Sequence, residues 1–340
     1  MAELNPRDAA KLTFLESCGW RDATIRPLAG DASNRTYDRL TDASGHPAVL
    51  MDAPPDKGED VRTFVAIAEW LTGAGLSAPE ILATDADHGF LLLEDLGDDL
   101  FARCLSRDPE LSGRLYGAAT DVLTHLHRQD PPPDLAPYDA DTTLPLAALA
   151  FDWYQTGITG SSDESQREAF TATFDPLLRS FDDDLTVLIQ RDYHAENLLW
   201  LPDRTGVRRV GLLDFQTAMR GHPVYDLVSV LQDARRDVPR AIEAEMKERF
   251  LADNPMNRDT FERAYAVFGL QRNLRILGVF ARLCMRNGKA HYVGLMPRVW
   301  GHIQTCLKHP DLQATGRILN NALPEPDARA LGTLRSKVAA

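Results

Sequence analysis

The segment RDYHAENLLW at residues 191–200, together with LLDFQ at 212–216, decides the interpretation of this sequence. Asn197 lies five positions after Asp192, and Asp214 lies 17 positions after Asn197. An aspartate on a tight loop can accept a proton from a hydroxyl, while an amide and a second carboxylate offer the oxygen ligands that Mg²⁺ prefers. The pattern therefore predicts phosphoryl transfer, with Asp192 as the base and Asn197 and Asp214 as the metal ligands.

The first ninety-odd residues read as a sheet with one inserted helix. The helix covers about residues 61–71, where the apolar positions share one face, and Gly73 and Gly75 mark its end. Short apolar runs separated by polar turns predict five strands. These runs are TIRPLA (24–29), RTYDRL (35–40), PAVLMD (47–52), EILATD (80–85) and GFLLLE (89–94).

The pattern becomes helical after residue 99. Helices are predicted around residues 115–126 and 170–181, and a long one spans about 259–286 and ends at Asn287-Gly288. The prolines of residues 130–145 predict an exposed connection without regular helix. One further group of short strands is predicted, namely TVLIQ (186–190), NLLWL (197–201) and VGLLDF (210–215), the last two joined by the turn RTGVRR (204–209). The fold class is α+β, a small β-rich lobe followed by a large α-rich one.

Composition excludes several classes of protein. The 340 residues are 44% hydrophobic and 26% charged, typical of a globular chain, and the net charge of −13 argues against nucleic acid as a partner. The start, MAELNPRDAAKL, lacks the apolar region of a secretory signal, and no apolar run approaches the roughly 20 residues of a membrane helix. The scattered cysteines predict reduced thiols in a cytoplasmic protein. They are Cys18, Cys104, Cys284 and Cys306.

These motifs, with the hinge-like LLLEDLGDD (91–99) and YDLVSVLQDAR (225–235), resemble the aminoglycoside phosphotransferase family, a branch of the protein-kinase-like superfamily. The resemblance implies a two-lobed protein-kinase-like fold that uses ATP and Mg²⁺. It implies a nucleotide-binding lobe at residues 1–95, a hinge at about 94–98, and a catalytic and substrate-binding lobe at 99–340. In that family the loop aspartate, here Asp192, is the catalytic base.

A narrower resemblance points to an amino-sugar acceptor. Several long blocks look like the bacterial N-acetylmuramate/N-acetylglucosamine anomeric kinases of peptidoglycan recycling. The blocks are VLMDAPP (49–55), FVAIAEWL (64–71), GFLLLEDLG (89–97), RDYHAENLLW (191–200), LDFQTAMRG (213–221) and GVFARLCMRNGKAHYV (278–293). This resemblance implies transfer of the γ-phosphate of ATP to the C1 hydroxyl of the free sugar, with no obligate protein partner.

The nucleotide site is expected in three parts of the first lobe. Glu94 and Leu96 are expected to hold adenine through backbone groups, with Val49 as an apolar wall. The strand at 48–52 lacks the lysine that this superfamily normally directs at the phosphates, and Arg35 is the candidate substitute, unless it is a solvent-facing strand residue. The turn between the first two strands is expected to cover the phosphates, through Asp31, Ala32, Ser33, Asn34 and Arg35.

The acceptor site is expected in the second lobe. Aromatic rings can stack on a sugar, and an arginine can bind a carboxylate with two hydrogen bonds. The candidates are Trp153, Tyr154, Arg191, His194, Gln216, Arg272 and Arg275. The alternatives are that the aromatics belong to the core and that the arginines form a solvated face. Gln216 could contact the substrate or the catalytic loop, or it could instead pack behind the site residues. Asp226 resembles the buried acid that braces this loop, although its local sequence favours a helix-start residue.

Two other functions stay open. One is a kinase for an aminoglycoside, homoserine or choline, although the basic character of residues 272–289 suits an anionic or neutral acceptor better. The other is a pseudokinase that binds nucleotide without catalysis, which only the missing lysine supports.

Overall fold

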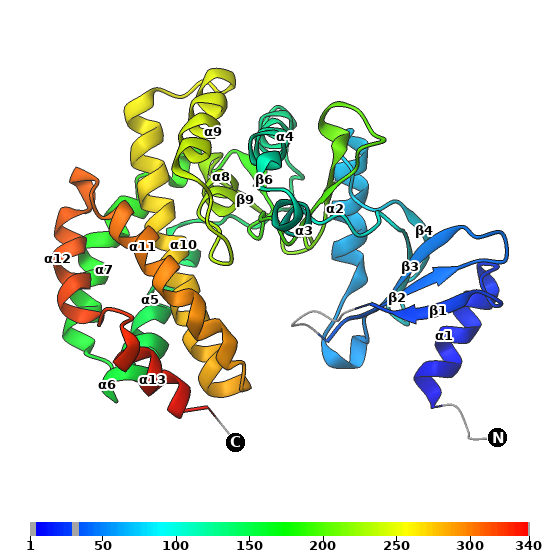
Figure 1. The fold of residues 1–340 in the computed structure, drawn as a ribbon, viewed down its shortest axis with the longest axis horizontal. Helices are drawn as coiled ribbons and strands as arrows, with labels where there is room; N and C mark the ends of the chain where they lie inside the picture. Colours follow the sequence, from blue (N-terminus) through cyan, green and yellow to red (C-terminus); the bar gives the residue numbers. More distant parts are fainter. Residues whose placement is uncertain (1–4, 29–33, 339–340) are drawn as a thin grey trace. The chain divides into compact units, whose positions relative to one another are not determined.

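The computed structural model describes residues 5–28 and 34–338. The chain groups into two compact units, unit 1 (Met1–Leu111 and Ala195–Thr217) and unit 2 (Ser112–His194 and Ala218–Ala340). The segment from 195 to 217, which carries Asn197 and Asp214, thus belongs with the N-terminal strands. Figure 1 shows the elements of both units coloured along the chain. The division of the chain into two lobes at residues 94–98 stays a prediction.

Unit 1 is built on a five-stranded antiparallel sheet with the strand order β1-β2-β3-β5-β4. The five strands that the sequence predicts are therefore confirmed. The turn before β5 requires Gly89, whose φ is 72°, because a Cβ there would lie 2.0 Å from the carbonyl oxygen of Ala53. The strands are β1 (Thr24–Pro27), β2 (Thr36–Thr41), β3 (Pro47–Asp52), β4 (Ile81–Asp85) and β5 (Phe90–Glu94).

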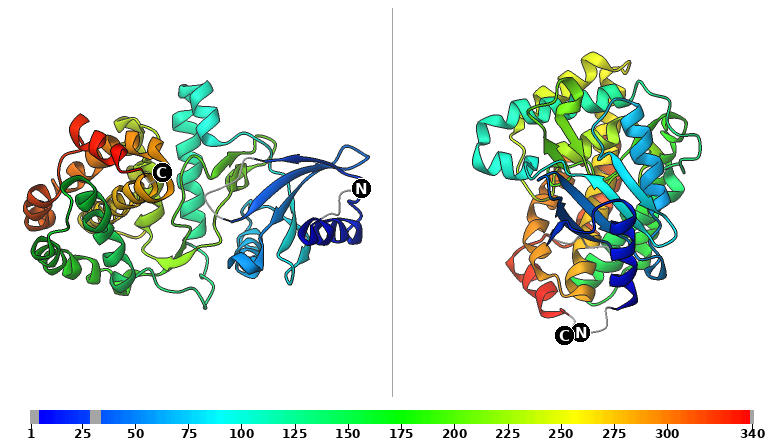
Figure 2. Two further views of the ribbon diagram at one scale, coloured as in Figure 1. Left: turned by 90° about the horizontal axis from the view of Figure 1, so that it is seen from below. Right: turned by 90° about the vertical axis from the view of Figure 1, so that its right-hand side faces the viewer.

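The two faces of this sheet contact different parts of unit 1. Because side chains alternate along a strand, Leu50 and Asp52 of β3 lie on one face and Val49 and Met51 on the other. The first face packs on α1 (Pro6–Ser17), which Figure 2 shows alongside the strands, and Asp52 forms an ion pair with Arg7 of that helix. The shared core consists of Phe14, Leu15, Leu40, Ala48, Leu50, Phe90 and Leu92. The second face, with Val49, is the one that faces the pocket described below.

The remainder of unit 1 includes two further helices, α2 and α3, and a hairpin. Asp60 caps helix α2 (Val61–Gly73), because its side chain accepts a hydrogen bond from the Arg62 N–H. The helix buries an apolar face, as the sequence predicts. The hairpin pairs β7 (Leu198–Trp200) with β8 (Val210–Leu212). Helix α3 (Phe101–Arg107) lies next to β7, and the Ala102 N–H donates to the carbonyl of Ala195. The hairpin therefore holds Asn197 before its first strand and Asp214 after its second.

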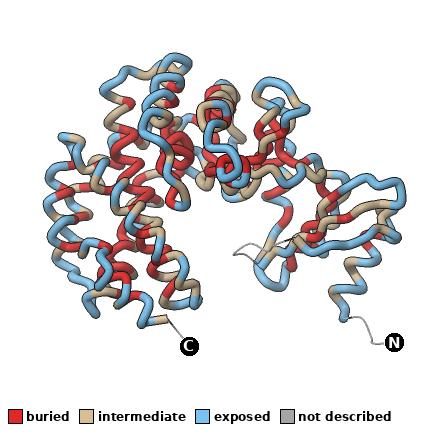
Figure 3. Tube along the Cα trace, in the orientation of Figure 1, coloured by how far each residue is buried: buried red, intermediate tan, exposed pale blue. Residues whose placement is uncertain are grey.

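Unit 2 is mainly helical around α10 (Arg258–Asn287), whose residues from 261 to 284 are largely buried (Figure 3). The Asn257 side chain caps its N-terminus and Gly288, at φ 69°, ends it, which confirms the predicted long helix. Helices α5, α8 and α11 pack against it. The other helices are α4 (Ser112–Leu126), α5 (Ala140–Leu149), α6 (Thr156–Thr159), α7 (Glu164–Arg179), α8 (Val224–Leu231), α9 (Arg240–Asp253), α11 (Met296–Cys306), α12 (Gln313–Ala322) and α13 (Ala328–Ser336), with a π-helical stretch, η3 (Ala150–Gln155).

Two sequence predictions are corrected here. β6 (Val187–Ile189) pairs with β9 (Met219–Gly221), not with the hairpin that follows it, because two short strands far apart in the chain meet in unit 2. The proline-rich segment 130–145 was expected to contain no helix, yet α5 begins at Ala140. Asp139 caps α5 by accepting from the Thr142 N–H, and Pro145 removes only one hydrogen bond from it.

The cysteines are as the sequence predicts. All four are free thiols, and three of them are buried. Among the residues that the structure describes, no helix combines the length and the apolar character that a membrane crossing requires.

Candidate active site

A pocket of about 370 Å³ lies within unit 1, lined by the sheet, by residues 94–98 and by the β7–β8 hairpin. Val49 contributes to its wall as the sequence predicts, and Asn197 and Asp214 form a polar end. A mostly apolar cleft with a few converging polar groups suits a planar base joined to a charged tail. The apolar lining residues are Leu28, Val49, Phe64, Pro79, Leu93, Leu96, Leu100, Leu199 and Leu213.

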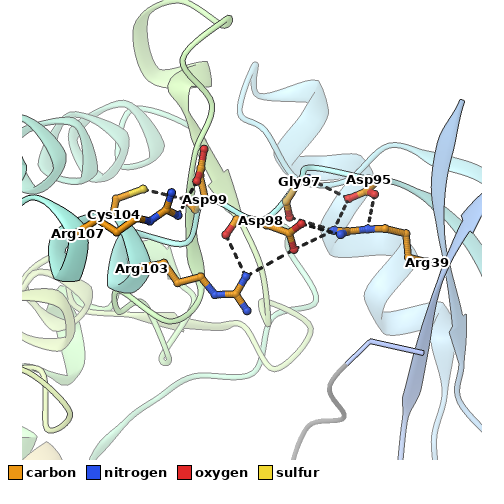
Figure 4. A network of polar contacts seen from close by, with 8 residues as sticks. All are labelled: Arg39, Asp95, Gly97, Asp98, Asp99, Arg103, Cys104 and Arg107. Carbon is orange, nitrogen blue, oxygen red and sulfur yellow. Dashed lines mark hydrogen bonds and ion pairs between the residues drawn. The ribbon is translucent and has the colours of Figure 1, made fainter. Parts of the chain in front are cut away.

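Arg39 of β2 fastens the segment after β5 to the sheet (Figure 4). Its Nε lies 2.7 Å from Asp95 Oδ2 and its Nη1 lies 2.7 Å from Asp98 Oδ2. The Gly97 N–H donates to Asp95 Oδ1 at 2.9 Å, which closes a tight turn. Farther along, Arg107 of α3 pairs with Asp99. Because Asp95 and Asp98 both pair with the Arg39 guanidinium, the segment that carries them has little conformational freedom. This segment lines the pocket.

Glu94 is engaged by its neighbours in unit 1. Its backbone N–H donates to the carbonyl of Glu80 at 2.8 Å, and its side chain pairs with Arg204. A hydrogen bond from Glu94 to a base in the pocket would therefore use its carbonyl, not its N–H. Leu96 lines the pocket, as expected.

Asp214 lies in a strained backbone conformation and in a network of polar contacts. Its φ is 58°, an uncommon value for a residue other than glycine. Asn197 Nδ2 lies 3.4 Å from Asp214 Oδ2, and Gln216 Nε2 donates to Asp214 Oδ1 at 2.6 Å. The Leu213 N–H donates to the carbonyl of Asn197 at 2.9 Å, which ties the two ends of the hairpin together. Strain held by such contacts is typical of functional positions.

These contacts fit a magnesium ion and give Gln216 a definite role. One carboxylate and one amide oxygen, completed by phosphate and water oxygens, are what Mg²⁺ commonly uses. Because Asn197 Nδ2 points at the carboxylate, its Oδ1 would be the ligand. Gln216 contacts Asp214, so it orients this carboxylate, and the alternative reading of Gln216 as a supporting residue is favoured over a substrate contact.

Arg35 points toward Asp214 rather than into solvent. Its side chain is only 11% exposed, with Nε 3.5 Å from Glu59 Oε2 and Nη2 3.8 Å from Asp214 Oδ1. The interpretation of Arg35 as a solvent-facing strand residue is therefore wrong. Glu59, which the sequence analysis missed, also accepts from the Asn34 N–H at 3.3 Å. The expected phosphate-covering residues Asp31, Ala32 and Ser33 lie outside the described residues.

Asp192 lies in unit 2 in a strongly basic setting. Burial acts to raise the pKa of Asp192, but Arg275 and Arg272 outweigh it and hold that pKa below its usual value. Arg191 acts in the same direction. Asp192 is consequently ionised at neutral pH, as a proton acceptor must be.

The backbone before Asp192 is fixed by Asp226, which corrects our interpretation of that residue. Asp226 is fully buried, and its carboxylate accepts from the N–H groups of Gln190 (2.6 Å) and Arg191 (3.0 Å). These bonds hold Arg191 at φ 71°. Burial raises the pKa of Asp226 to about 7, although the two N–H donors and Arg272 oppose the shift. Asp226 does lie in the first turn of α8, but its carboxylate contacts brace the catalytic loop.

Arg272 also supports the catalytic loop, through Ser229. It is 3% exposed, its Nη2 donates to Ser229 Oγ at 2.6 Å, and that hydroxyl donates to the Arg191 carbonyl at 3.3 Å. Arg275 is half-buried and lies near Tyr225, Tyr138 and Asp192, which together raise its pKa although burial acts to lower it. Both arginines thus face Asp192 and not open solvent.

Of the other predicted acceptor residues, Tyr154 belongs to the core, whereas Trp153, Arg191 and His194 lie elsewhere in unit 2. Tyr154 is fully buried and donates its hydroxyl to the Pro324 carbonyl at 2.7 Å, so it packs the core of unit 2 and has no face for a sugar. Trp153 is half-buried on η3. Arg191 places its guanidinium carbon 5.2 Å from the centre of the Tyr138 ring. His194 is 5% exposed, and its Nε2 lies 3.3 Å from Nη1 of Arg235.

Comparison with known proteins identifies the family. The model of the phosphotransferase enzyme family matches residues 24–266. The chain belongs to this family. An N-acetylmuramate/N-acetylglucosamine kinase of Caulobacter vibrioides is 37% identical, with 90% of this chain and 94% of the relative covered. A Pseudomonas aeruginosa protein of the same name is 34% identical, with the same coverage.

Solved structures of the family share the fold. An aminoglycoside phosphotransferase of Streptomyces rimosus, in complex with ADP and streptomycin, has a TM-score of 0.53 and 19% identity over 78% of this chain and 97% of its own. A choline kinase of Streptococcus pneumoniae has a TM-score of 0.59 and 13% identity over 88% and 99%. The predicted protein-kinase-like fold and the prediction of an ATP-dependent kinase of this family are therefore confirmed.

Proposed function

We propose that this kinase transfers the γ-phosphate of ATP to the anomeric C1 hydroxyl of N-acetylmuramate and N-acetylglucosamine, in the cytoplasm and during peptidoglycan recycling. The observation that carries the proposal is the match to N-acetylmuramate/N-acetylglucosamine kinases along 90% of the chain at 37% and 34% identity. The acceptor oxygen bonds to the γ-phosphorus as the bond to the bridging oxygen breaks, ADP leaves, and Asp192 takes the hydroxyl proton.

The pocket of unit 1 supports a nucleotide with its phosphates at the polar end. Adenine would lie between Val49 and Leu199, held by the carbonyl of Glu94 and the N–H of Leu96. Asn197 and Asp214 would hold Mg²⁺, which shields the phosphate charge when bound.

Arg35 supplies the cation that the sheet lacks. Met51 lies two residues after Val49 on the same face of β3, is apolar and is 1% exposed. The contacts of Arg35 with Glu59 and Asp214 support a role for its guanidinium at the phosphates in place of a lysine on β3. With Arg35 in this role, the missing lysine would no longer favour a pseudokinase.

The charge around Asp192 supports an acidic hydroxyl as the acceptor. A carboxylate with a lowered pKa is a weaker base than an ordinary aspartate. The C1 hydroxyl of a reducing sugar is more acidic than its other hydroxyls, because the ring oxygen withdraws electron density. Surrounding arginines also disfavour cationic acceptors such as aminoglycosides or choline.

The position of the product phosphate tests this proposal. We expect the purified protein, given ATP and Mg²⁺, to convert both sugars to 1-phosphates, which phosphorus–carbon NMR coupling will assign to C1. Methyl glycosides, whose C1 oxygen is blocked, should bind without reacting. A phosphate on C6, or phosphorylation of a methyl glycoside, would show that the acceptor position is wrong although the chain is a kinase.

Replacing Arg35 with methionine is expected to raise the dissociation constant of ATP about 10- to 100-fold, as the loss of a hydrogen bond to a charged group does. Adenosine binding should stay unchanged, since it has no phosphates, and Arg35→Lys should recover part of the ATP affinity. Calorimetric titration of each variant measures this. The matched control is Arg26→Met, which removes an exposed arginine of β1. Equal losses for ATP and adenosine would exclude a phosphate contact.

A further inference from the structure

Arg235 differs from the other arginines that surround the catalytic loop in unit 2. Its residue is exposed, whereas Arg272 is buried and Arg191 and Arg275 are only partly accessible. Arg235 follows α8, in the turn where its own N–H donates to Asp233 Oδ1 at 2.8 Å. It is therefore the accessible member of a group of cations that otherwise serve the loop itself.

A buried histidine anchors the Arg235 side chain. Nη1 of Arg235 lies 3.3 Å from Nε2 of His194, two residues after Asp192. Because a guanidinium only donates, His194 Nε2 is the acceptor and Nδ1 carries the proton. This Nδ1 is buried without a partner among the described residues. Burial and Arg235 lower the pKa of His194 to about 4, so the ring is neutral and adds no charge of its own.

The neighbouring cations already have partners. Arg272 donates to Ser229, and Arg275 lies with Asp192 and two tyrosines. On the acidic side, Asp192 faces Arg275, and Asp226 accepts two backbone N–H groups. Asp233, which is 1% exposed, accepts from the Arg235 N–H and lies near both His194 and Tyr116. The guanidinium of Arg235 thus contacts a neutral ring, whereas Arg272 and Arg275 already contact Ser229, Asp192 and the tyrosines.

We propose that Arg235, held by His194, binds the carboxylate of the acceptor and so selects N-acetylmuramate over N-acetylglucosamine at the same catalytic loop. The inference rests on the proposed function. The two sugars share their ring and acetamido group, and only N-acetylmuramate carries a lactyl carboxylate, on the C3 oxygen. A planar guanidinium with one edge on His194 keeps other N–H groups for a carboxylate.

The pair of substrates gives this proposal a built-in control. In Arg235→Gln, kcat/KM for N-acetylmuramate should fall about 10- to 100-fold, the usual cost of losing a hydrogen bond to a charged group. The value for N-acetylglucosamine should stay within about threefold, and the loss for N-acetylmuramate should appear mainly in KM, since the contact aids binding rather than the chemical step. Arg235→Lys keeps the charge but not the planar guanidinium. Its kcat/KM for N-acetylmuramate should therefore lie between those of the wild type and Arg235→Gln.

Arg258→Gln is the matched charge control. Arg258 is the first residue of α10 and pairs with Glu248 on the surface of unit 2. It should leave the ratio of the two sugars unchanged. An equal loss for both sugars in Arg235→Gln, or an unchanged ratio in both Arg235 variants, would overturn the proposal while the kinase assignment stands. If the wild-type protein phosphorylated neither sugar, the proposed function would fail, and this inference with it.

Discussion

Asp192→Asn is expected to lower kcat about 10²- to 10⁴-fold, the range for loss of a general base. Asparagine has nearly the same shape, so the buried loop keeps its packing, while the proton acceptor is lost. The Asp226 carboxylate that fixes the loop backbone is untouched. ATP affinity should stay within about twofold, because Asp192 lies outside the residues that line the pocket of unit 1.

Single-turnover kinetics with saturating sugar, combined with calorimetric titration of ATP, will separate the chemical step from binding. Asp237→Asn is the matched control, since Asp237 is a highly exposed carboxylate of the same unit that pairs with Arg298. A variant of Asp192 that kept most of the wild-type kcat would remove the base assignment. A large loss of ATP affinity would instead assign Asp192 to nucleotide binding.

Local pattern was enough to predict most of the elements. The alternation of PAVLMD and the helical face of residues 61–71 each follow from burial of one side of a single element. The long helix α10 was predicted because Asn287-Gly288 gives an unambiguous end. The pairing of β6 with β9 was missed because two three-residue strands some 30 positions apart leave no periodic signal.

The site was predictable only where chemistry and spacing coincide. Asn197 and Asp214 flank one hairpin, so their contact follows from the hairpin that the sequence indicates. Glu59 and Arg235 were missed because their roles depend on contacts with Arg35 and His194 that no local pattern shows. Tyr154 illustrates the opposite error, since an aromatic residue near a predicted site is more often part of the core.

Asp214→Ala is expected to weaken Mg²⁺-dependent binding of ATP by roughly 100-fold, and Asn197→Ala by about tenfold. The difference follows from charge, because Asp214 offers an anionic oxygen and Asn197 a neutral one. Titrating Mg²⁺ at fixed ATP measures both effects. Asp87→Ala, at an exposed position of unit 1, is the control for loss of one negative charge.

Asp214→Asn separates the loss of charge from backbone strain. Alanine tolerates a φ of 58° poorly, so Asp214→Ala removes the ligand and disturbs the turn together. Asparagine adopts this conformation readily and keeps an oxygen, so it should lose most of the Mg²⁺ dependence while adenosine still binds normally. If Asp214→Asn kept the wild-type Mg²⁺ requirement, Asp214 would hold the turn through Gln216 and Asn197 rather than bind metal. If adenosine binding also disappeared, the pocket itself would depend on this carboxylate.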